Sequence, residues 1–496
     1  MSKGIRTCHS NVQDLYCATS KGAVTILGYT GCGGAVTIPE SINGRPVTGI
    51  GRNAFYSCTT LTGITLPHTV TSIGEGAFQG CINLATITVD QRNPRYQSVD
   101  GVLFNKRRTT LIQCPGAKAG QYVIPVRVTS IGKGAFYGCY SLTHVVMPST
   151  VTRIGEYAFF YCDNLANVSI PDSVTTIGVC AFQNCGNLTS ITISARITVI
   201  KDYTFAGCGR LLDVVIPDSV TAIGNSAFYD CTCLAHISLG KTVTSIGAKT
   251  FEYCSNLLSI VVNAGNPAYE SHKGVLFDKR NTTLLHFPAG KAGRYSIPNG
   301  VSTIASRAFY DCNGLTHIKI PYSVTIIGMT PDSIASVGDQ AFCYCGALMA
   351  IDVEARNPSY CSVDGVLFDK RHATLIQCPA GKTGSYSVPN GAASIRERAF
   401  ECCAGVTSIT FPASIEDIRR QAFIRCSGLT GMYFRGNGPQ IFREGFPRLC
   451  PIHRLPDATG WDHPRHQDLA LSLWEHAPDP NSKTMTLQTK KTQKAT

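Results

Sequence analysis

Apolar and polar residues alternate along most of this chain in a block that recurs about every 23 residues. A clear example is the segment 165–187, LANVSIPDSVTTIGVCAFQNCGN. Val168 and Ile170 alternate with polar neighbours, which predicts a short strand with one buried face. Pro171 lacks an amide donor, so we expect this strand to end there.

The second half of the same block predicts a return path to the next strand. Val174 and Ile177 are spaced as inward side chains of another short extended segment. Gly178 is expected to supply a turn. Phe182 and Cys185 fit a single helical or 3-10 turn that leads the chain to the next strand.

A Phe-x-x-Cys motif marks the repeat. Most steps between successive Phe residues are 23 residues, three are 58, and one is 33, where PYSVTIIG is followed by a second copy, PDSIASVG. The motif occurs at Phe55/Cys58, Phe78/Cys81, Phe136/Cys139, Phe159/Cys162, Phe182/Cys185, Phe205/Cys208, Phe228/Cys231, Phe251/Cys254, Phe309/Cys312, Phe342/Cys345, Phe400/Cys403 and Phe423/Cys426. Spacing this regular predicts a repeat architecture.

A single block of this kind is too small to fold alone. Its few inward side chains cannot offset the conformational entropy lost on ordering 23 residues. Neighbouring blocks must therefore bury its faces and pair its strand, which defines a solenoid. The predicted fold is an α/β repeat solenoid with short parallel strands and short helical or 3-10 turns.

The three 58-residue steps share an inserted motif that begins at Asn93, Asn266 and Asn357. Each has two apolar runs around a polar turn, so we expect a longer double unit with a hairpin-like excursion inside the stack. The turns carry repeated basic residues: Lys106, Arg107, Arg108, Lys279, Arg280, Lys370 and Arg371. Polyanion binding through these turns is one functional hypothesis.

The leading functional hypothesis is recognition of a protein or glycan through the outward strand positions. These positions vary between repeats while the inward ones stay apolar, as in the contact surfaces of repeat proteins. The candidate binding surface comprises His144, Asn167, Asp213, His236, His317, Lys319 and Asp352. The alternatives are that these are merely solvated strand residues, or that the chain self-associates through exposed edges of the stack.

Composition adds few candidates for chemistry. The net charge of +12 is mild for 496 residues and does not indicate specific nucleic-acid binding. No motif for catalysis or cofactor binding is present, so we expect no enzyme activity, no cofactor and no metal. No apolar run is long enough for membrane insertion or an export signal, which leaves localisation open between cytoplasm and cell surface.

Cysteine and histidine are the remaining metal-ligating residues. The twelve motif cysteines are expected to be small buried side chains, because parallel neighbours have poor geometry for disulfides. The C-terminal histidines His453, His463, His466 and His476 suit either a metal site or, more simply, an irregular capping segment with Trp461 and Trp474.

The repeat L-x-x-I-x-I-P-x-S-V-T-x-I-G-x-x-A-F-x-x-C resembles the BspA-type leucine-rich repeats of bacterial and protozoan surface proteins. The resemblance covers roughly Val36 to Phe434. It implies adhesion or another interaction at the cell surface. We divide the chain into an N-terminal lead-in and capping coil (1–50), the leucine-rich-repeat solenoid (51–434), a C-terminal capping segment (435–474) and a disordered basic tail (475–496).

Overall fold

Short strands linked by turns make up the whole of the described chain. The computed structural model describes residues 6–7, 14–328, 340–441, 450–462 and 471–473. Within these ranges there is no helix. The chain forms two compact units: unit 1 is residues 1–291 and unit 2 is residues 292–496.

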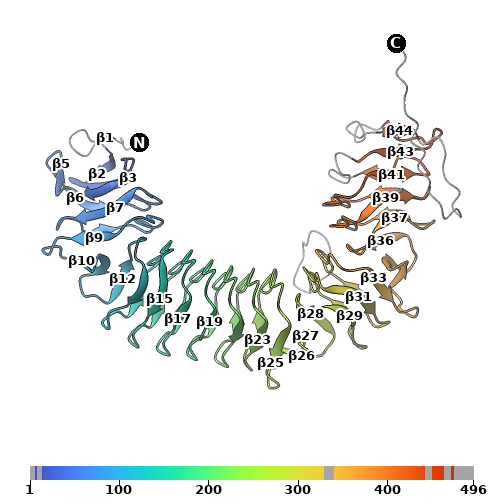
Figure 1. Ribbon diagram of the computed structural model, residues 1–496, viewed down its shortest axis with the longest axis horizontal. Helices are drawn as coiled ribbons and strands as arrows, with labels where there is room; N and C mark the ends of the chain where they lie inside the picture. The colour runs from blue at the N-terminus through green and yellow to red at the C-terminus, as the bar shows by residue number, and fades with distance from the viewer. Residues whose placement is uncertain (1–5, 8–13, 329–339, 442–449, 463–470, 474–496) are drawn as a thin grey trace, which may run out of the picture. The chain divides into compact units, whose positions relative to one another are not determined.

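The coils of unit 1 pair through three successive parallel sheets, which together we call the first ladder (Figure 1). Val145 pairs with Val168 and Val168 with Ile191, so the register advances by one 23-residue repeat per strand. The strands are β4 (Gly34–Thr37), β7 (Leu61–Leu66), β9 (Thr86–Val89), β13 (Gly120–Val123), β15 (Leu142–Val146), β17 (Asn167–Ser169), β19 (Ser190–Ile191), β21 (Asp213–Val215), β23 (His236–Leu239) and β25 (Ser259–Val262).

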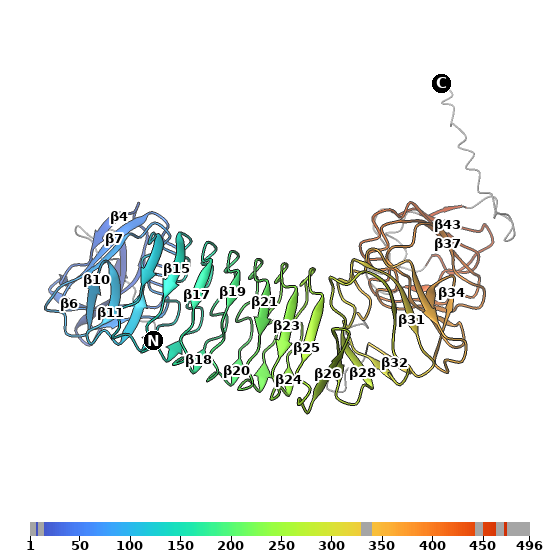
Figure 2. The same ribbon diagram turned by 60° about the horizontal axis from the view of Figure 1, so that its bottom comes forward.

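Two-residue strands form a second ladder along another edge of unit 1, as Figure 2 shows. They are β8 (Ser72–Ile73), β14 (Ser130–Ile131), β16 (Arg153–Ile154), β18 (Thr176–Ile177), β20 (Val199–Ile200), β22 (Ala222–Ile223) and β24 (Ser245–Ile246). Ile131, Ile154 and Ile177 are buried in register. The two extended segments predicted for each repeat are confirmed.

The N-terminal part of unit 1 joins the second ladder through an antiparallel hairpin. Its strands are β1 (Arg6–Thr7), β2 (Leu15–Ser20), β3 (Ala23–Tyr29), β5 (Ser41–Ile42) and β6 (Arg45–Ile50). β2 and β3 pair antiparallel, β3 pairs parallel with β6, and β6 pairs parallel with β8.

Unit 2 repeats the same two ladders. Its first ladder contains β29 (Gly293–Ser296), β31 (Leu315–Ile320), β33 (Ala350–Val353), β37 (Gly384–Ser387), β39 (Val406–Phe411), β41 (Gly431–Phe434), β43 (Ile452–Arg454) and β44 (Leu471–Leu473). Its second contains β30 (Thr303–Ile304), β32 (Ile326–Ile327), β38 (Ser394–Ile395), β40 (Asp417–Ile418) and β42 (Gln440–Ile441). The second copy of the duplicated octapeptide, residues 331–338, lies outside the described residues.

The predicted helical or 3-10 turn is wrong for the described coils, where the return segment is a series of tight turns. Alternate amides donate in different directions. Tyr157 N and Phe159 N donate to Val179 O and Ala181 O of the next coil, at 3.0 and 2.7 Å, while Phe160 N bonds back to Tyr157 O within the turn. A helix would use all these donors internally. The left-handed φ of 55° at Tyr157 breaks any helix.

Gly178 also has a role different from the one predicted. Its φ does not lie in the left-handed region. A Cβ at Gly178 would stand 2.3 Å from Glu156 N of the preceding coil. The glycine is therefore required for close approach of two coils rather than for the turn itself.

The Phe and Cys columns form the centre of the core. Phe136 and Phe159 stack with ring centroids 4.7 Å apart, and Phe159 and Phe182 follow at 5.0 Å. The buried Cys185 thiol donates to Phe159 O at 3.1 Å, and Cys208 donates to Phe182 O at 3.2 Å. Each thiol thus satisfies a carbonyl of the preceding coil. The prediction of small buried cysteines is confirmed for eleven of the twelve motif positions; Cys58, in the first coil with this motif, is only partly buried.

The hairpin excursions predicted for the three longer units are confirmed. Each consists of three antiparallel strands. In unit 1 these are β10 (Tyr96–Val99), β11 (Val102–Asn105) and β12 (Thr110–Gln113), then β26 (Tyr269–His272), β27 (Val275–Asp278) and β28 (Thr283–His286); in unit 2 they are β34 (Tyr360–Val363), β35 (Val366–Asp369) and β36 (Thr374–Gln377). β12 then pairs parallel with β14, so the excursion remains part of the stack.

A fully buried asparagine anchors each excursion to the coil before it. Asn93 Nδ2 donates to Pro67 O and Val70 O at 3.0 and 2.8 Å, and its Oδ1 accepts from the amides of residues 95 and 96. Asn266 and Asn357 make the equivalent four bonds. The Asn-Pro motif is therefore a structural requirement of the long coil.

Candidate functional site

The outward face of the first ladder holds the predicted surface residues in register. His144 and Asn167 are exposed neighbours on β15 and β17, with Asn167 Nδ2 3.4 Å from His144 Nε2. Asp213 and His236 are exposed neighbours on β21 and β23. The structure therefore brings these four residues together in two adjacent pairs within unit 1.

The other three predicted residues lie in unit 2. His317 and Lys319 are on β31, where Lys319 pairs in register with Asp352 of β33. His317 is only partly exposed, whereas Lys319 and Asp352 are exposed. Lys319 Nζ lies 3.0 Å from Glu354 Oε1, and this hydrogen bond lowers the pKa of Glu354.

A second outward column, which carries exposed valines interspersed with Ser and Thr, runs beside the polar column in unit 1. Val123 and Val146 are in register on β13 and β15, and Val215 and Val261 flank Ser238 on β21 to β25. Val215 is 68% exposed. The spacing of two residues after the polar position predicts the same outward face for Val146 and Val215, although the predicted binding residues are the polar ones alone. Exposed apolar side chains beside polar ones suit a contact surface.

The predicted basic turns are exposed, but one lysine in each turn donates a hydrogen bond to a backbone carbonyl of the same long coil. Lys106 Nζ donates to Gln91 O at 3.0 Å, Lys279 Nζ to Ala264 O at 3.4 Å and Lys370 Nζ to Ala355 O at 3.0 Å. The remaining predicted members, Arg107, Arg108, Arg280 and Arg371, are exposed on the same turns. Repetition of this bond gives the lysine a structural role in each long coil.

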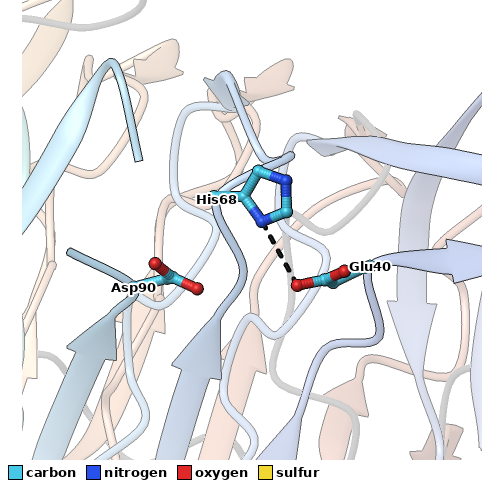
Figure 3. Close-up of side chains that lie close together, drawn as sticks. All are labelled: Glu40, His68 and Asp90. Carbon is cyan, nitrogen blue, oxygen red and sulfur yellow. Dashed lines mark ion pairs between the residues drawn. The ribbon is translucent and has the colours of Figure 1, made fainter. Parts of the chain in front are cut away.

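Three ligand-type side chains gather where the first strands of unit 1 end (Figure 3). Glu40, His68 and Asp90 follow β4, β7 and β9, and their ligand atoms all lie within 4.8 Å of one another. His68 Nδ1 is 3.2 Å from Glu40 Oε1. One imidazole and two carboxylates form a donor set that several divalent metals accept. The sequence alone did not predict this cluster, because its members come from separate repeats.

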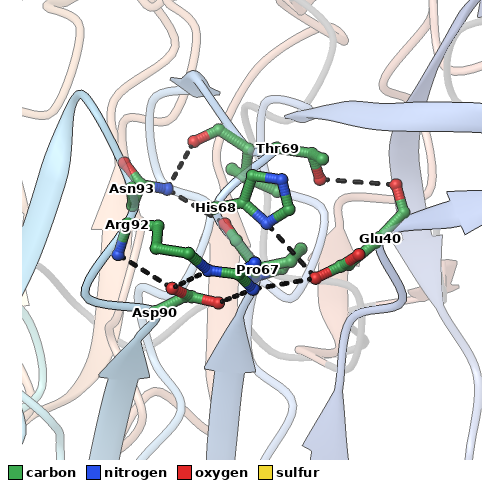
Figure 4. Close-up of polar contacts among 8 residues, drawn as sticks. Glu40, Pro67, His68, Thr69, Asp90, Arg92 and Asn93 are labelled. Carbon is green, nitrogen blue, oxygen red and sulfur yellow. Dashed lines mark hydrogen bonds and ion pairs between the residues drawn. The ribbon is translucent and has the colours of Figure 1, made fainter.

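One guanidinium already forms ion pairs with both carboxylates of this cluster (Figure 4). The side chain of Arg92 lies 2.7 Å from Asp90 Oδ2 and 3.2 Å from Glu40 Oε1. Its hydrogen bonds lower the pKa of Asp90 to about 2. A metal would have to displace Arg92. The cluster is therefore best described as a network of ion pairs next to Asn93 that links successive coils.

The C-terminal histidines are only partly described. His453 stacks on Tyr433 with centroids 4.6 Å apart and has Nδ1 2.6 Å from Ser472 Oγ. His463, His466 and His476 lie outside the described residues, as does Trp474. Trp461 is buried and packs edge-on against Phe434 at 4.9 Å.

No helix of the described residues is both long and apolar enough to cross a membrane. A search of curated proteins found no match to the chain. Solved structures with similar folds include a leucine-rich cell-surface protein from Faecalibacterium prausnitzii, 26% identical over 88% of this chain and 97% of that one, with a TM-score of 0.46.

Other similar structures are also leucine-rich-repeat proteins or bacterial antigens. A leucine-rich-repeat protein from Bacteroides ovatus is 25% identical over 89% of this chain and 98% of that one, with a TM-score of 0.39. The pneumococcal vaccine antigen PcpA is 15% identical over 96% of this chain and 99% of that one, with a TM-score of 0.40.

The family model for the BspA-type leucine-rich-repeat region matches six copies, over residues 35–116, 129–258, 291–359 and 377–455. These ranges include most strands of both ladders and the Phe and Cys columns described above. The chain belongs to the BspA-type leucine-rich-repeat family.

Proposed function

We propose that this protein is a non-catalytic binding protein that recognises a protein or glycan through the outward face of its first ladder, in adhesion or another interaction at the cell surface. The observation that carries the proposal is the pair of parallel outward columns on β13 to β25. One column is polar, and the other carries the valines Val123, Val146, Val215 and Val261 interspersed with Ser and Thr. Both columns are exposed while the inward face is filled.

The two columns provide complementary parts of a contact surface. Val215 and Val261 offer apolar area that gains free energy when it is covered. Asp213 and His236 beside them offer hydrogen bonds that fix the orientation of a partner. Because both columns lie on hydrogen-bonded strands, the backbone is already ordered and loses little conformational entropy on binding.

Surface plasmon resonance of the full chain against immobilised fibronectin, laminin and collagen tests the proposal. In the test variant, Val215→Ser, His236→Ala and Val261→Ser are combined. Ser238 already occupies the middle of this column. A matched control is Val126→Ser, at a site 74% exposed and outside the strands.

The expected result is binding to at least one matrix protein, with a loss of tenfold or more in the triple variant and no change in the control. Equal affinities of the triple variant and the unaltered chain would remove the proposal for this face.

The exposed basic turns favour polyanion binding as a second candidate. Arg107 and Arg108 extend the charge beyond the committed Lys106. If the turns bind heparin, affinity will fall steeply with added salt and in the variant Arg107→Gln with Arg108→Gln. An affinity that does not change with salt contradicts this candidate.

A further inference from the structure

Aromatic side chains gather on the turn segments of unit 1, away from the first-ladder face. Tyr137 and Phe160 stack with centroids 5.0 Å apart, and Tyr56 Oη is 3.2 Å from Tyr137 Oη. Phe160 also meets Tyr157 and Tyr161 edge-on, at 5.5 and 4.5 Å. The aromatic patch consists of Tyr56, Tyr137, Tyr140, Tyr157, Phe160 and Tyr161.

Three rings of this patch are exposed, and the other three, Tyr137, Tyr157 and Phe160, are partly exposed. Tyr56 is 46% exposed, Tyr161 38% and Tyr140 37%. Tyrosine rings combine an apolar face with a polar tip, so they are favoured where a partner brings both kinds of group. Contiguous exposed rings of this kind mark interaction sites.

The charges beside the patch compensate one another. Lys133 Nζ lies 2.8 Å from both Glu75 and Glu156, and Arg52 lies 3.8 Å from Glu75. The ammonium of Lys133 also sits 5.6 Å from the centre of the Tyr157 ring. Burial raises the pKa of Tyr137, which keeps its hydroxyl protonated. The patch and its border therefore present little net charge.

A surface hollow of about 290 Å³ adjoins this border. Glu75 and Lys133 line it together with Phe78, Ile112 and Gln113. Its volume is near the lower end of small-ligand pockets, about 300 to 1000 Å³. Apolar and polar groups thus meet in one hollow, which shares Lys133 with the border of the patch.

We propose that the aromatic patch and the adjoining hollow bind a neutral glycan. A pyranose ring has faces of C–H groups, which stack on aromatic rings, and an edge of hydroxyl groups, which exchange hydrogen bonds with tyrosine hydroxyls and carboxylates. The compensated border gives no attraction to a charged ligand. This site is separate from the first-ladder face and does not depend on the function proposed for it.

Affinity electrophoresis of the full chain tests the proposal, with laminarin, xyloglucan, soluble starch, dextran or galactomannan in the gel and heparin as a charged control. The test variant combines Tyr137→Gln, Phe160→Gln and Tyr161→Asn. The next coil carries Gln183 and Asn184 at these positions, and Asn184 has a φ of 59°, so the fold already accommodates them.

The matched control is Tyr203→Ser, which removes a tyrosine that is 41% exposed at a turn position outside the patch. Ser226 occupies the same position one coil later, also with positive φ. Far-ultraviolet circular dichroism and thermal unfolding check that each variant folds. If the triple variant does not fold, Tyr56→Gln alone serves as the test variant.

We expect at least one neutral polysaccharide to retard the unaltered chain and the control equally, and the triple variant to lose tenfold or more in affinity. Retardation by heparin alone, by none of the polysaccharides, or equally for the triple variant overturns the proposal. The first-ladder variant should retain glycan binding, so failure of either proposal leaves the other testable.

Discussion

Replacing Asn93 with alanine should loosen the first long coil. The Asn93 side chain is fully buried and makes four hydrogen bonds, two as donor to Pro67 O and Val70 O and two as acceptor. At about 1 kcal/mol for each net hydrogen bond, the expected cost is about 4 kcal/mol. That is a large part of the usual stability of a domain, about 5–15 kcal/mol.

Two further variants separate the donor and acceptor roles. Asn93→Asp keeps the acceptor but replaces the donors by a carboxylate that faces two carbonyl oxygens, so it should cost as much at pH 7. Its protonated form regains one donor, so part of the loss should be recovered at acid pH. Asn164→Ala is the control, because Asn164 is exposed and makes only two bonds in the described part of the chain: it donates to Tyr140 O at 2.8 Å and accepts from Asn187 Nδ2 at 3.1 Å.

The assay combines urea unfolding with amide hydrogen exchange. Repeat proteins can open in part, so the unfolding curve alone does not locate the loss. Exchange at the amides of residues 95 and 96, which bond to Asn93 Oδ1, should accelerate in the alanine variant. A stability within 1 kcal/mol of the unaltered chain, together with unchanged exchange at these amides, would refute the reasoning.

Three other perturbations test the core. Burial raises the pKa of the Cys208 thiol to about 12, and those of Cys162 and Cys185 rise as well. Stability is therefore complete below pH about 8.5 and should fall above it by up to about 1.4 kcal/mol per pH unit for each thiol. In the variant that combines Cys162→Ala, Cys185→Ala and Cys208→Ala, the urea midpoint should fall less between pH 8 and 10 than in the unaltered chain. An identical dependence of the midpoint on pH in the two proteins contradicts this. Burial lowers the pKa of His286 to about 4, and its Nε2 has no hydrogen-bond partner in the described part of the chain. The free energy of unfolding should therefore fall by at most about 3 kcal/mol as the pH drops from about 6.5 to 4. The variant His286→Gln, which has the residue found at the equivalent positions Gln113 and Gln377, should abolish this pH dependence. A pH dependence that persists in the variant would show that it has another origin. Arg398 lies 3.2 Å from the buried Glu401 carboxylate, so Arg398→Leu should cost about 3–5 kcal/mol in urea unfolding, whereas the double variant with Glu401→Gln should recover much of it.

The sequence by itself determined the repeat and most of what faces inward. Because each coil contacts mainly its neighbours, positions 23 residues apart in the chain become neighbours in space. Val145, Val168 and Ile191 could therefore be assigned to one column from spacing alone, as could the outward residues between them. The hairpins of the long coils were also predictable, because two apolar runs around a polar turn specify them locally.

Only the tertiary structure decided the features that depend on how one coil meets another. Phe182 and Cys185 sit in tight turns rather than a helix because half of the turn amides bond to the next coil, and local sequence does not reveal that competition. Tyr56 and Tyr137 are 81 residues apart, yet their hydroxyls meet beside a long coil. Side-chain contacts of this kind depend on the exact stacking of irregular coils, which the period of the sequence does not encode.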